Sequence, residues 1–156
     1  MINIGISKKN CHEIAKLLNH LLSNEYVLYT KTWKFHWNVE GKHFGALHAF
    51  FDAQKEQLGV VIDEVAERVR SLDLKSDGTL TEFLEKTSLN EHPGKNPDDL
   101  GMIKLLLLDH EEIIKKIRHD ADFVLEKLGD AGTNNFLCEL LEKHEKMAWM
   151  LRAHIE

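Results

Sequence analysis

The chain has 156 residues, of which 43% are hydrophobic, and a formal net charge of −6 with histidine taken as neutral. This length suits a single domain, residues 1–156, with one core, and the acidic balance argues against strong generic binding to nucleic acid. No apolar stretch reaches the roughly 20 residues of a membrane span, and no secretory leader is recognisable, so we expect a protein of the cytoplasm with no membrane partner. Cys11 and Cys138 lie far apart, outside any CxxC motif, and are predicted to pack between helices.

Two long helices are expected in the first half of the chain. Abundant Leu, Glu, Lys and Ala, with only two prolines, favour helix throughout. The first helix is predicted over residues 10–37, where Asn10 and Glu13 have the spacing of a capping box. A break at Gly41 separates it from a second helix predicted over residues 43–72.

The second half begins with a short helix and continues with two long ones. Thr79 and Glu82 form a second capping-box pattern, which predicts a helix of about two turns. Both prolines fall in residues 89–97, which are predicted to be a loop, and Asn96–Pro97 is predicted to open the third long helix. Gly129–Gly132 is predicted to separate it from the fourth. The apolar stripe of these two helices contains Ile103, Leu106, Leu107, His110, Ile113, Ile114, Ile117, Val124, Leu125, Leu137, Leu140, Leu141, His144, Met147 and Leu151.

These elements predict an all-α four-helix bundle. The connection between the second and third long helices spans roughly 25 residues, including the short helix, and is too long for a tight hairpin. A connection of this length can carry the chain back along the bundle, so the two helices that it joins are expected to run in parallel.

Two pairs of metal-capable side chains lie on the second predicted helix. His48 and Asp52 are spaced i,i+4, and so are Asp63 and Glu67, so each pair projects from one helix face. Fifteen positions separate His48 from Asp63, which is about 22 Å along a helix. Metals bind nitrogen and oxygen ligands at about 2 Å, so the two pairs cannot share a site within one subunit.

A second copy of the chain can join the pairs. They lie symmetrically about the middle of the helix, so two antiparallel copies crossing near Gln57 and Leu58 would bring each pair against the other pair of the partner. The sequence therefore predicts two symmetric metal sites at a dimer interface.

His36, near the end of the first predicted helix, extends the candidate set to two imidazoles and three carboxylates. This donor set suits Fe(II), Mn(II) or Zn(II) and lacks the thiolates of structural zinc and iron–sulfur sites. Ten histidines and 26 acidic residues also make chance i,i+4 pairs common, so a solvated helix face is the competing interpretation. His110 and His144 lie on core stripes and are predicted to be core histidines rather than ligands.

At these residues the sequence resembles a known family, the Dps proteins (DNA-binding proteins from starved cells), which are ferritin-like mini-ferritins. The resemblance covers nearly the whole chain. It rests on His36-Trp37-Asn38, Gly41, Phe44, His48, Asp52, Asp63 and Ala66-Glu67-Arg68, and near the C-terminus on Leu128-Gly129-Asp130, Thr133 and Lys146-Met147-Ala148-Trp149-Met150-Leu151.

The resemblance implies a ferritin-like bundle whose twelve subunits form a hollow homododecamer. It implies a dinuclear ferroxidase centre at the two-fold interface, to which one subunit contributes His36, His48 and Asp52 and its mate contributes Asp63 and Glu67. Two Fe(II) ions would be oxidised at each centre, preferentially with hydrogen peroxide, and ferric oxide would be stored inside the shell, which limits oxidative damage. Trp37 resembles the family tryptophan beside the centre.

Two departures from the family pattern qualify the resemblance. Many family members bind DNA through a lysine-rich tail, whereas this chain has only Lys8 and Lys9 before the first predicted helix, so we expect weak or absent DNA binding. Ala131 and Asn135 also stand where the family often places the acids of a three-fold pore. Asp130 and Glu139 are the candidates to replace those acids.

Three other interpretations make different demands on the sequence. A true ferritin or bacterioferritin would need Glu-x-x-His motifs inside the bundle, and the only such string, Glu40–His43, lies in the predicted turn. A non-catalytic nucleoid-associated protein would need basic tails. A structural helical oligomer with incidental metal sites predicts that iron oxidation does not depend on Asp63.

Overall fold

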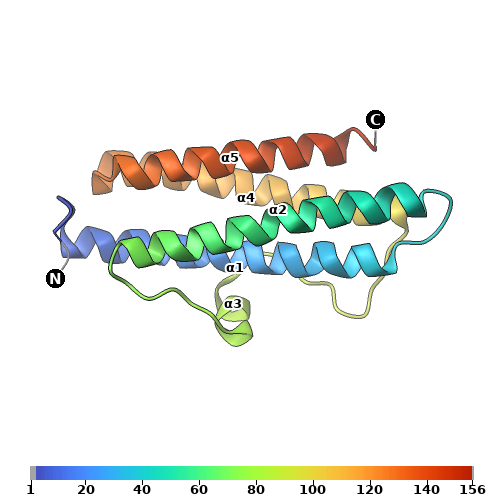
Figure 1. The fold of residues 1–156 in the computed structure, drawn as a ribbon, viewed down its shortest axis with the longest axis horizontal. Coiled ribbons are helices and arrows are strands. Elements are labelled where there is room, and N and C mark those ends of the chain that lie inside the picture. The colour runs from blue at the N-terminus through green and yellow to red at the C-terminus, as the bar shows by residue number, and fades with distance from the viewer. Residues whose placement is uncertain (1–2, 156) are drawn as a thin grey trace.

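The computed structural model describes residues 3–155, which form four long helices and one short helix (Figure 1). The helices are α1 (Lys8–Asn38), α2 (Phe44–Ser71), α3 (Leu80–Lys86), α4 (Asp99–Leu128) and α5 (Ala131–Arg152). The long helices pack side by side around one core, which confirms the predicted all-α bundle. Within the described part of the chain, no helix is both long and apolar enough to span a lipid bilayer.

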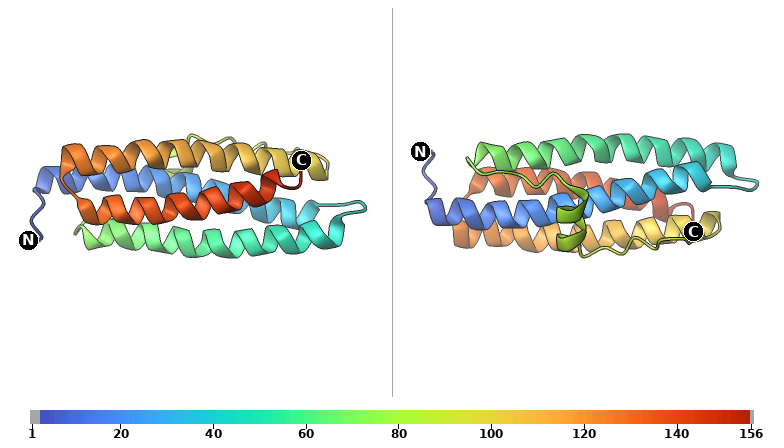
Figure 2. Two further views of the ribbon diagram at one scale, coloured as in Figure 1. Left: turned by 90° about the horizontal axis from the view of Figure 1, so that it is seen from above. Right: turned by 90° about the horizontal axis from the view of Figure 1, so that it is seen from below.

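The chain crosses the bundle once between α2 and α4. The right view in Figure 2 shows the crossover running back along α1, with α3 in its middle, so that α2 and α4 point in the same direction. Phe83 of α3 is buried and its ring stacks on Tyr26 of α1, with ring centroids 4.5 Å apart. The predicted parallel arrangement is therefore confirmed, and α3 serves to fasten the crossover to the outside of α1.

One predicted helix cap is wrong and another is confirmed. Ser7 caps α1 by accepting a hydrogen bond from the Asn10 backbone N–H, so the helix starts before Asn10. The Asn10 side chain instead donates to the Leu128 carbonyl at 2.9 Å, which ties α1 to the end of α4. Thr79 and Glu82 do form the predicted capping box of α3. A tertiary contact therefore occupies the side chain that the sequence pattern assigned to the cap.

The third long helix begins two residues later than predicted. Asp98 caps α4 by accepting from the Gly101 N–H, so Asn96 and Pro97 belong to the preceding loop. A carboxylate at this position also interacts favourably with the helix dipole, which an amide does only weakly. Gly129 ends α4 in the left-handed conformation at φ 72°, where glycine avoids the steric cost of a Cβ atom.

The core consists of inward-facing residues from all four long helices, with Phe35, Phe51, Leu58 and Leu106 almost completely buried. Every predicted inward position of α5 is buried, as predicted. Leu125 is 46% exposed on the far side of α4, so its assignment to the core was wrong. Cys138 is also exposed, whereas Cys11 packs in the core as predicted.

Polar side chains lie within this core and link helices that are distant in sequence. Glu25, His110 and His144 have no exposed surface, and the Nε2 atom of His144 lies 2.8 Å from a carboxylate oxygen of Glu25. The Nδ1 atoms of His110 and His144 are 3.0 Å apart. Burial, with a smaller contribution from His144, holds the pKa of His110 well below its ordinary value, so His110 is neutral near pH 7. Both histidines are core residues, as predicted.

Candidate metal centre

His36 and His48 lie face to face where α1 and α2 meet. Their rings stack with centroids 3.8 Å apart and planes inclined by 21°. The bonding is reciprocal, because the Nδ1 of His36 lies 2.8 Å from the His48 carbonyl oxygen and the Nδ1 of His48 lies 2.9 Å from the His36 carbonyl oxygen. Two residues twelve positions apart in sequence therefore fix each other's ring orientation.

This reciprocal bonding determines which nitrogen can bind a metal. A carbonyl oxygen only accepts, so each Nδ1 must carry the proton and donate. In the neutral imidazole the lone pair then lies on Nε2, which is free to act as a ligand. A hydrogen bond from the other ring nitrogen is the usual way in which proteins orient a metal-binding histidine. Both imidazoles are thus held in the tautomer that a metal centre requires.

Asp52 lies one turn beyond His48 on α2 and is partly exposed. Its carboxylate lies 2.9 Å from the Nζ of Lys55, and this hydrogen bond holds the pKa of Asp52 below its ordinary value. Asp52 is therefore a carboxylate at neutral pH, as a metal ligand must be. His36, His48 and Asp52 are called the histidine half-site below.

Lys55 was not identified from the sequence, although its i,i+3 spacing from Asp52 was visible. Its Nζ also lies 2.6 Å from Glu56 and 5.1 Å from the centroid of the Trp33 ring. Its hydrogen bonds to Glu56 and Asp52 raise the pKa of Lys55, which is therefore a cation at every physiological pH. The histidine half-site thus includes a fixed positive charge.

Asp63 and Glu67 are exposed on the other half of α2 and are called the carboxylate half-site. Since α2 is one continuous helix, about 22 Å separates Asp63 from His48, and Glu67 lies one turn further away. Among residues 3–155 of this single chain, no three His, Cys, Asp or Glu side chains converge in an arrangement that could hold a metal. The structure therefore places His36 against His48, with Asp52 one turn further along α2, and leaves Asp63 and Glu67 on the other half of that helix.

The surface between the half-sites is open along α2. Gln57 and Val60 are exposed there, and 56% of Val60 is accessible. Leu58, in contrast, is fully buried in the core of its own subunit. A second copy crossing this helix would therefore contact Gln57 and Val60 rather than Leu58.

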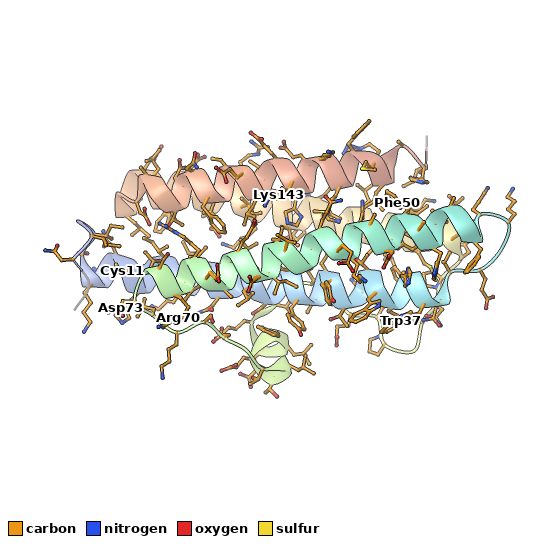
Figure 3. The ribbon with its side chains drawn as sticks, in the orientation of Figure 1. Cys11, Trp37, Phe50, Arg70, Asp73 and Lys143 are labelled. Atoms are coloured by element: carbon orange, nitrogen blue, oxygen red, sulfur yellow. The ribbon has the colours of Figure 1, made fainter. Side chains whose placement is uncertain are left out.

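Trp37 directly follows His36 in the sequence and lies near the end of α1, as Figure 3 shows. It is 62% exposed, and its ring packs against Trp33 with centroids 4.8 Å apart. The role that the resemblance suggests for it at the centre stays a prediction.

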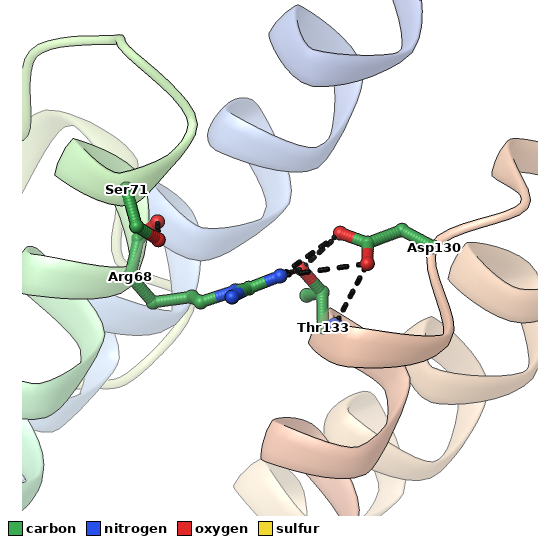
Figure 4. A network of polar contacts seen from close by, with 4 residues as sticks. All are labelled: Arg68, Ser71, Asp130 and Thr133. Atoms are coloured by element: carbon green, nitrogen blue, oxygen red, sulfur yellow. Dashed lines mark hydrogen bonds and ion pairs between the residues drawn. The ribbon is translucent and has the colours of Figure 1, made fainter. Parts of the chain in front are cut away.

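Asp130, one of the two pore candidates, is engaged within the subunit (Figure 4). It caps α5 by accepting from the Thr133 backbone N–H at 3.0 Å, and the Arg68 guanidinium from α2 lies 3.2 Å from its other oxygen. Its side chain is only 4% exposed, whereas Glu139 is exposed. These contacts give Asp130 a structural role, and the assignment of both residues to a pore stays a prediction.

We expect Asp130→Ala to lower the free energy of unfolding by about 1–3 kcal/mol, because it removes a helix cap and leaves Arg68 with the Thr133 hydroxyl but without its carboxylate partner. Asp130→Asn keeps a capping oxygen, so its free energy of unfolding should fall by clearly less. Urea unfolding at one fixed protein concentration measures both losses. Equal losses for the two variants would contradict a capping role.

The same carboxyl predicts a pH dependence. Burial by itself raises the pKa of Asp130, but the hydrogen bonds from Thr133 and the charge of Arg68 outweigh it, so the pKa lies below its ordinary value. A lowered pKa contributes stability that is complete above the unfolded value of about 3.9 and is lost as the pH falls through the folded value. The stability difference between the wild type and Asp130→Asn should stay constant between about pH 5 and 7 and shrink below about pH 4.

Comparisons with known proteins agree with this architecture. A family model for the ferritin-like domain matches residues 15–156. The chain is 41% identical over 155 residues to an uncharacterized low temperature-induced protein of Nostoc sp., covering 99% of this chain and 87% of that protein. It is 31% identical over 144 residues to the DNA protection during starvation protein 2 of Bacillus anthracis, covering 92% and 97%.

A solved structure shows the same fold. The Dps protein of Vibrio cholerae O1, described as a member of a broad superfamily of ferritin-like diiron-carboxylate proteins, superimposes with a TM-score of 0.94. The two chains are 29% identical, and the match covers 100% of this chain and 97% of that one. Fold and comparisons together define a ferritin-like protein. Within that class, the chain belongs to the Dps family of mini-ferritins.

Proposed function

We propose that this protein is an iron-storage and iron-detoxification mini-ferritin that oxidises Fe(II) at centres shared between two-fold-related subunits. The observation that carries this proposal is the reciprocal bonding of His36 and His48, which frees both Nε2 atoms beside an ionised Asp52. Family membership and the diiron-carboxylate description of the Vibrio relative support iron as the substrate.

The partner subunit supplies the rest of each centre. One subunit contributes the histidine half-site and its mate contributes the carboxylate half-site, Asp63 and Glu67. Twofold symmetry then creates two equivalent centres per dimer. Both carboxylates are exposed in the single chain, as residues that bind a metal across an interface must be.

Each part of the donor set has a chemical task. Neutral imidazoles bind Fe(II) before oxidation, and the carboxylates favour the higher charge that develops on the product. Two Fe(II) ions together supply the two electrons that, with two protons from solvent, reduce one hydrogen peroxide to two water molecules. Because both electrons come from the pair, no hydroxyl radical is released, and the ferric product is stored as oxide inside a dodecameric shell in the cytoplasm.

The direct test is to load the purified protein with Fe(II) without oxygen, add hydrogen peroxide and follow the ferric absorbance against protein-free buffer. We expect fast oxidation with about two Fe(II) consumed per peroxide, and soluble iron that co-migrates with a dodecamer-sized particle. Oxidation at the rate of buffer, with precipitating iron, would favour the structural-oligomer interpretation. A parallel run with dioxygen in place of peroxide measures the preference between the two oxidants.

DNA protection by binding is the weaker candidate. Lys8 and Lys9 are part of the first turn of α1, and the net charge of the chain is −6. We therefore propose that any protection of DNA comes from removing iron and peroxide rather than from coating the duplex. A salt-sensitive gel shift at sub-micromolar protein and moderate ionic strength would contradict this.

A further inference from the structure

The ammonium group of Lys55 is placed where a metal-bound Asp52 would feel its charge. Its side chain is 11% exposed, and Nζ lies 2.9 Å from Asp52 and 2.6 Å from Glu56. The neighbouring Trp33 ring, 5.1 Å away, covers the cation. A lysine that is buried, paired on both sides and packed against an aromatic ring has lost most of the mobility of a surface lysine.

We infer that Lys55 is a resident cation that tunes the metal affinity of the histidine half-site and favours release of the ferric product. The inference rests on the proposed function, since it concerns the same site. Before iron arrives, the ammonium neutralises Asp52 and keeps its carboxylate in place. When iron binds Asp52, the same ammonium remains nearby and repels the metal.

The repulsion depends on the charge of the metal. Coulomb energy is proportional to the product of the charges, so a fixed unit charge opposes a trivalent ion about one and a half times as strongly as a divalent ion. Because the Lys55 side chain is little exposed, solvent does not fully screen the repulsion between its ammonium and the metal. Lys55 therefore weakens the binding of Fe(III) more than that of Fe(II), which directs the product away from the centre and toward storage.

Glu56 moderates this effect without removing it. Glu56 is exposed, whereas Asp52 is partly covered. Solvent therefore screens the interaction of Lys55 with Glu56 more strongly than its interaction with Asp52. Within the subunit, the other titratable groups that act on Asp52 are the two imidazoles, which are neutral when their Nε2 atoms bind metal. Lys55 is thus a cation in direct contact with a ligand of the histidine half-site.

The test measures binding of two redox-inert probes to the assembled protein, Co(II) for the divalent ion and Tb(III) for the trivalent ion. The variant is Lys55→Gln, which keeps a hydrogen-bond donor for Asp52 and removes only the charge. We expect Co(II) affinity to rise about tenfold and Tb(III) affinity to rise about thirtyfold, because the free energy scales with metal charge. Comparing each metal only with itself cancels the different ligand preferences of the two ions.

Three further variants complete the design. Lys55→Arg keeps the charge and should retain wild-type affinities. Lys55→Met removes both charge and hydrogen bond and should also bind both metals more tightly, which keeps the test valid if the glutamine variant folds poorly. Lys86→Met is the matched control, since Lys86 pairs with Asp77 on the crossover, away from the site, and should leave both affinities unchanged.

The outcomes separate this inference from the proposed function. Equal rises in Co(II) and Tb(III) affinity, or no rise in either neutral variant, would overturn the inference about Lys55. The shared centre would still be supported if Co(II) binding depends on Asp52. If Asp52→Asn binds Co(II) as tightly as the wild type, Asp52 is not a ligand of the proposed centre. The proposed function and the inference about Lys55 are then both wrong. A larger rise for Tb(III) in both neutral variants, with wild-type affinities in Lys55→Arg, supports it.

Discussion

Asp63→Ala is expected to reduce peroxide-dependent iron oxidation to the rate in protein-free buffer while the particle still assembles. Asp63 is exposed in the single chain and makes no side-chain contact that the bundle needs, so its removal costs no core packing. In the proposed centre it is one of only two ligands from the partner subunit. Stopped-flow ferric absorbance measures the activity, and size-exclusion chromatography measures the assembly.

Glu64 offers a matched control, since it is the next residue on α2 and is also acidic. Its carboxylate pairs with Lys143 of α5 at 2.6 Å, so it is engaged within its own subunit. Glu64→Ala removes the same charge from the same helix and should keep most of the oxidation rate. Comparable losses in the two variants would assign the effect to general acidity of the surface.

Sharing of the centre between subunits can be tested by mixing two inactive variants. When His48→Ala and Asp63→Ala subunits assemble together, a mixed dimer has one doubly damaged centre and one intact centre. Random mixing should then restore about a quarter of the wild-type activity. Co-assembly of His48→Ala with Asp52→Ala should restore none, because both residues belong to the same half-site. Recovery in neither mixture would contradict a centre built across the two-fold interface.

The largest loss of stability is expected from breaking the buried ion pair between α1 and α4. Lys31 and Asp109 approach to 2.5 Å, and their side chains are 1% and 12% exposed. Asp109→Leu leaves the Lys31 ammonium unpaired in the core, and removing one partner of a buried pair costs about 3–5 kcal/mol. Urea unfolding at fixed protein concentration measures the loss.

Removing Lys31 instead of Asp109 should lower the free energy of unfolding by less. Burial raises the pKa of Asp109 although Lys31 opposes it, so without Lys31 this carboxyl can take up a proton and become neutral. Lys31→Met is therefore expected to be less damaging than Asp109→Leu, and the double variant Lys31→Met/Asp109→Leu should recover most of the stability. Additive losses in the double variant would show that the two charges act independently.

The sequence by itself determined the helices and the candidate ligand pairs, because both depend on local periodicity. Every position of α5 that the 3.6-residue repeat assigned to the core is buried, and the same repeat placed His48 with Asp52 and Asp63 with Glu67. The length of the crossover was enough to predict that α2 and α4 run in parallel, since it excludes a hairpin.

Helix ends were less predictable, because several polar residues compete for each cap. Asn10 has the right chemistry to cap α1, but its side chain bonds to Leu128, which is 118 positions away. Likewise Asn96–Pro97 is a good local signal for a helix start, yet Asp98 caps α4. Leu125 fits the apolar repeat of α4 but lies on the face that no other helix of the subunit covers.

Only the tertiary structure decided the electrostatics of the histidine half-site. Sequence spacing placed His36 and His48 in the candidate set, but the antiparallel approach of α1 and α2 creates the two Nδ1–carbonyl hydrogen bonds that leave Nε2 free. Lys55 became part of the site because Trp33 of the neighbouring helix covers it and directs its charge to Asp52. Periodicity gives the face on which a side chain lies, whereas its tautomer, burial and charge partner depend on the helix packed against it.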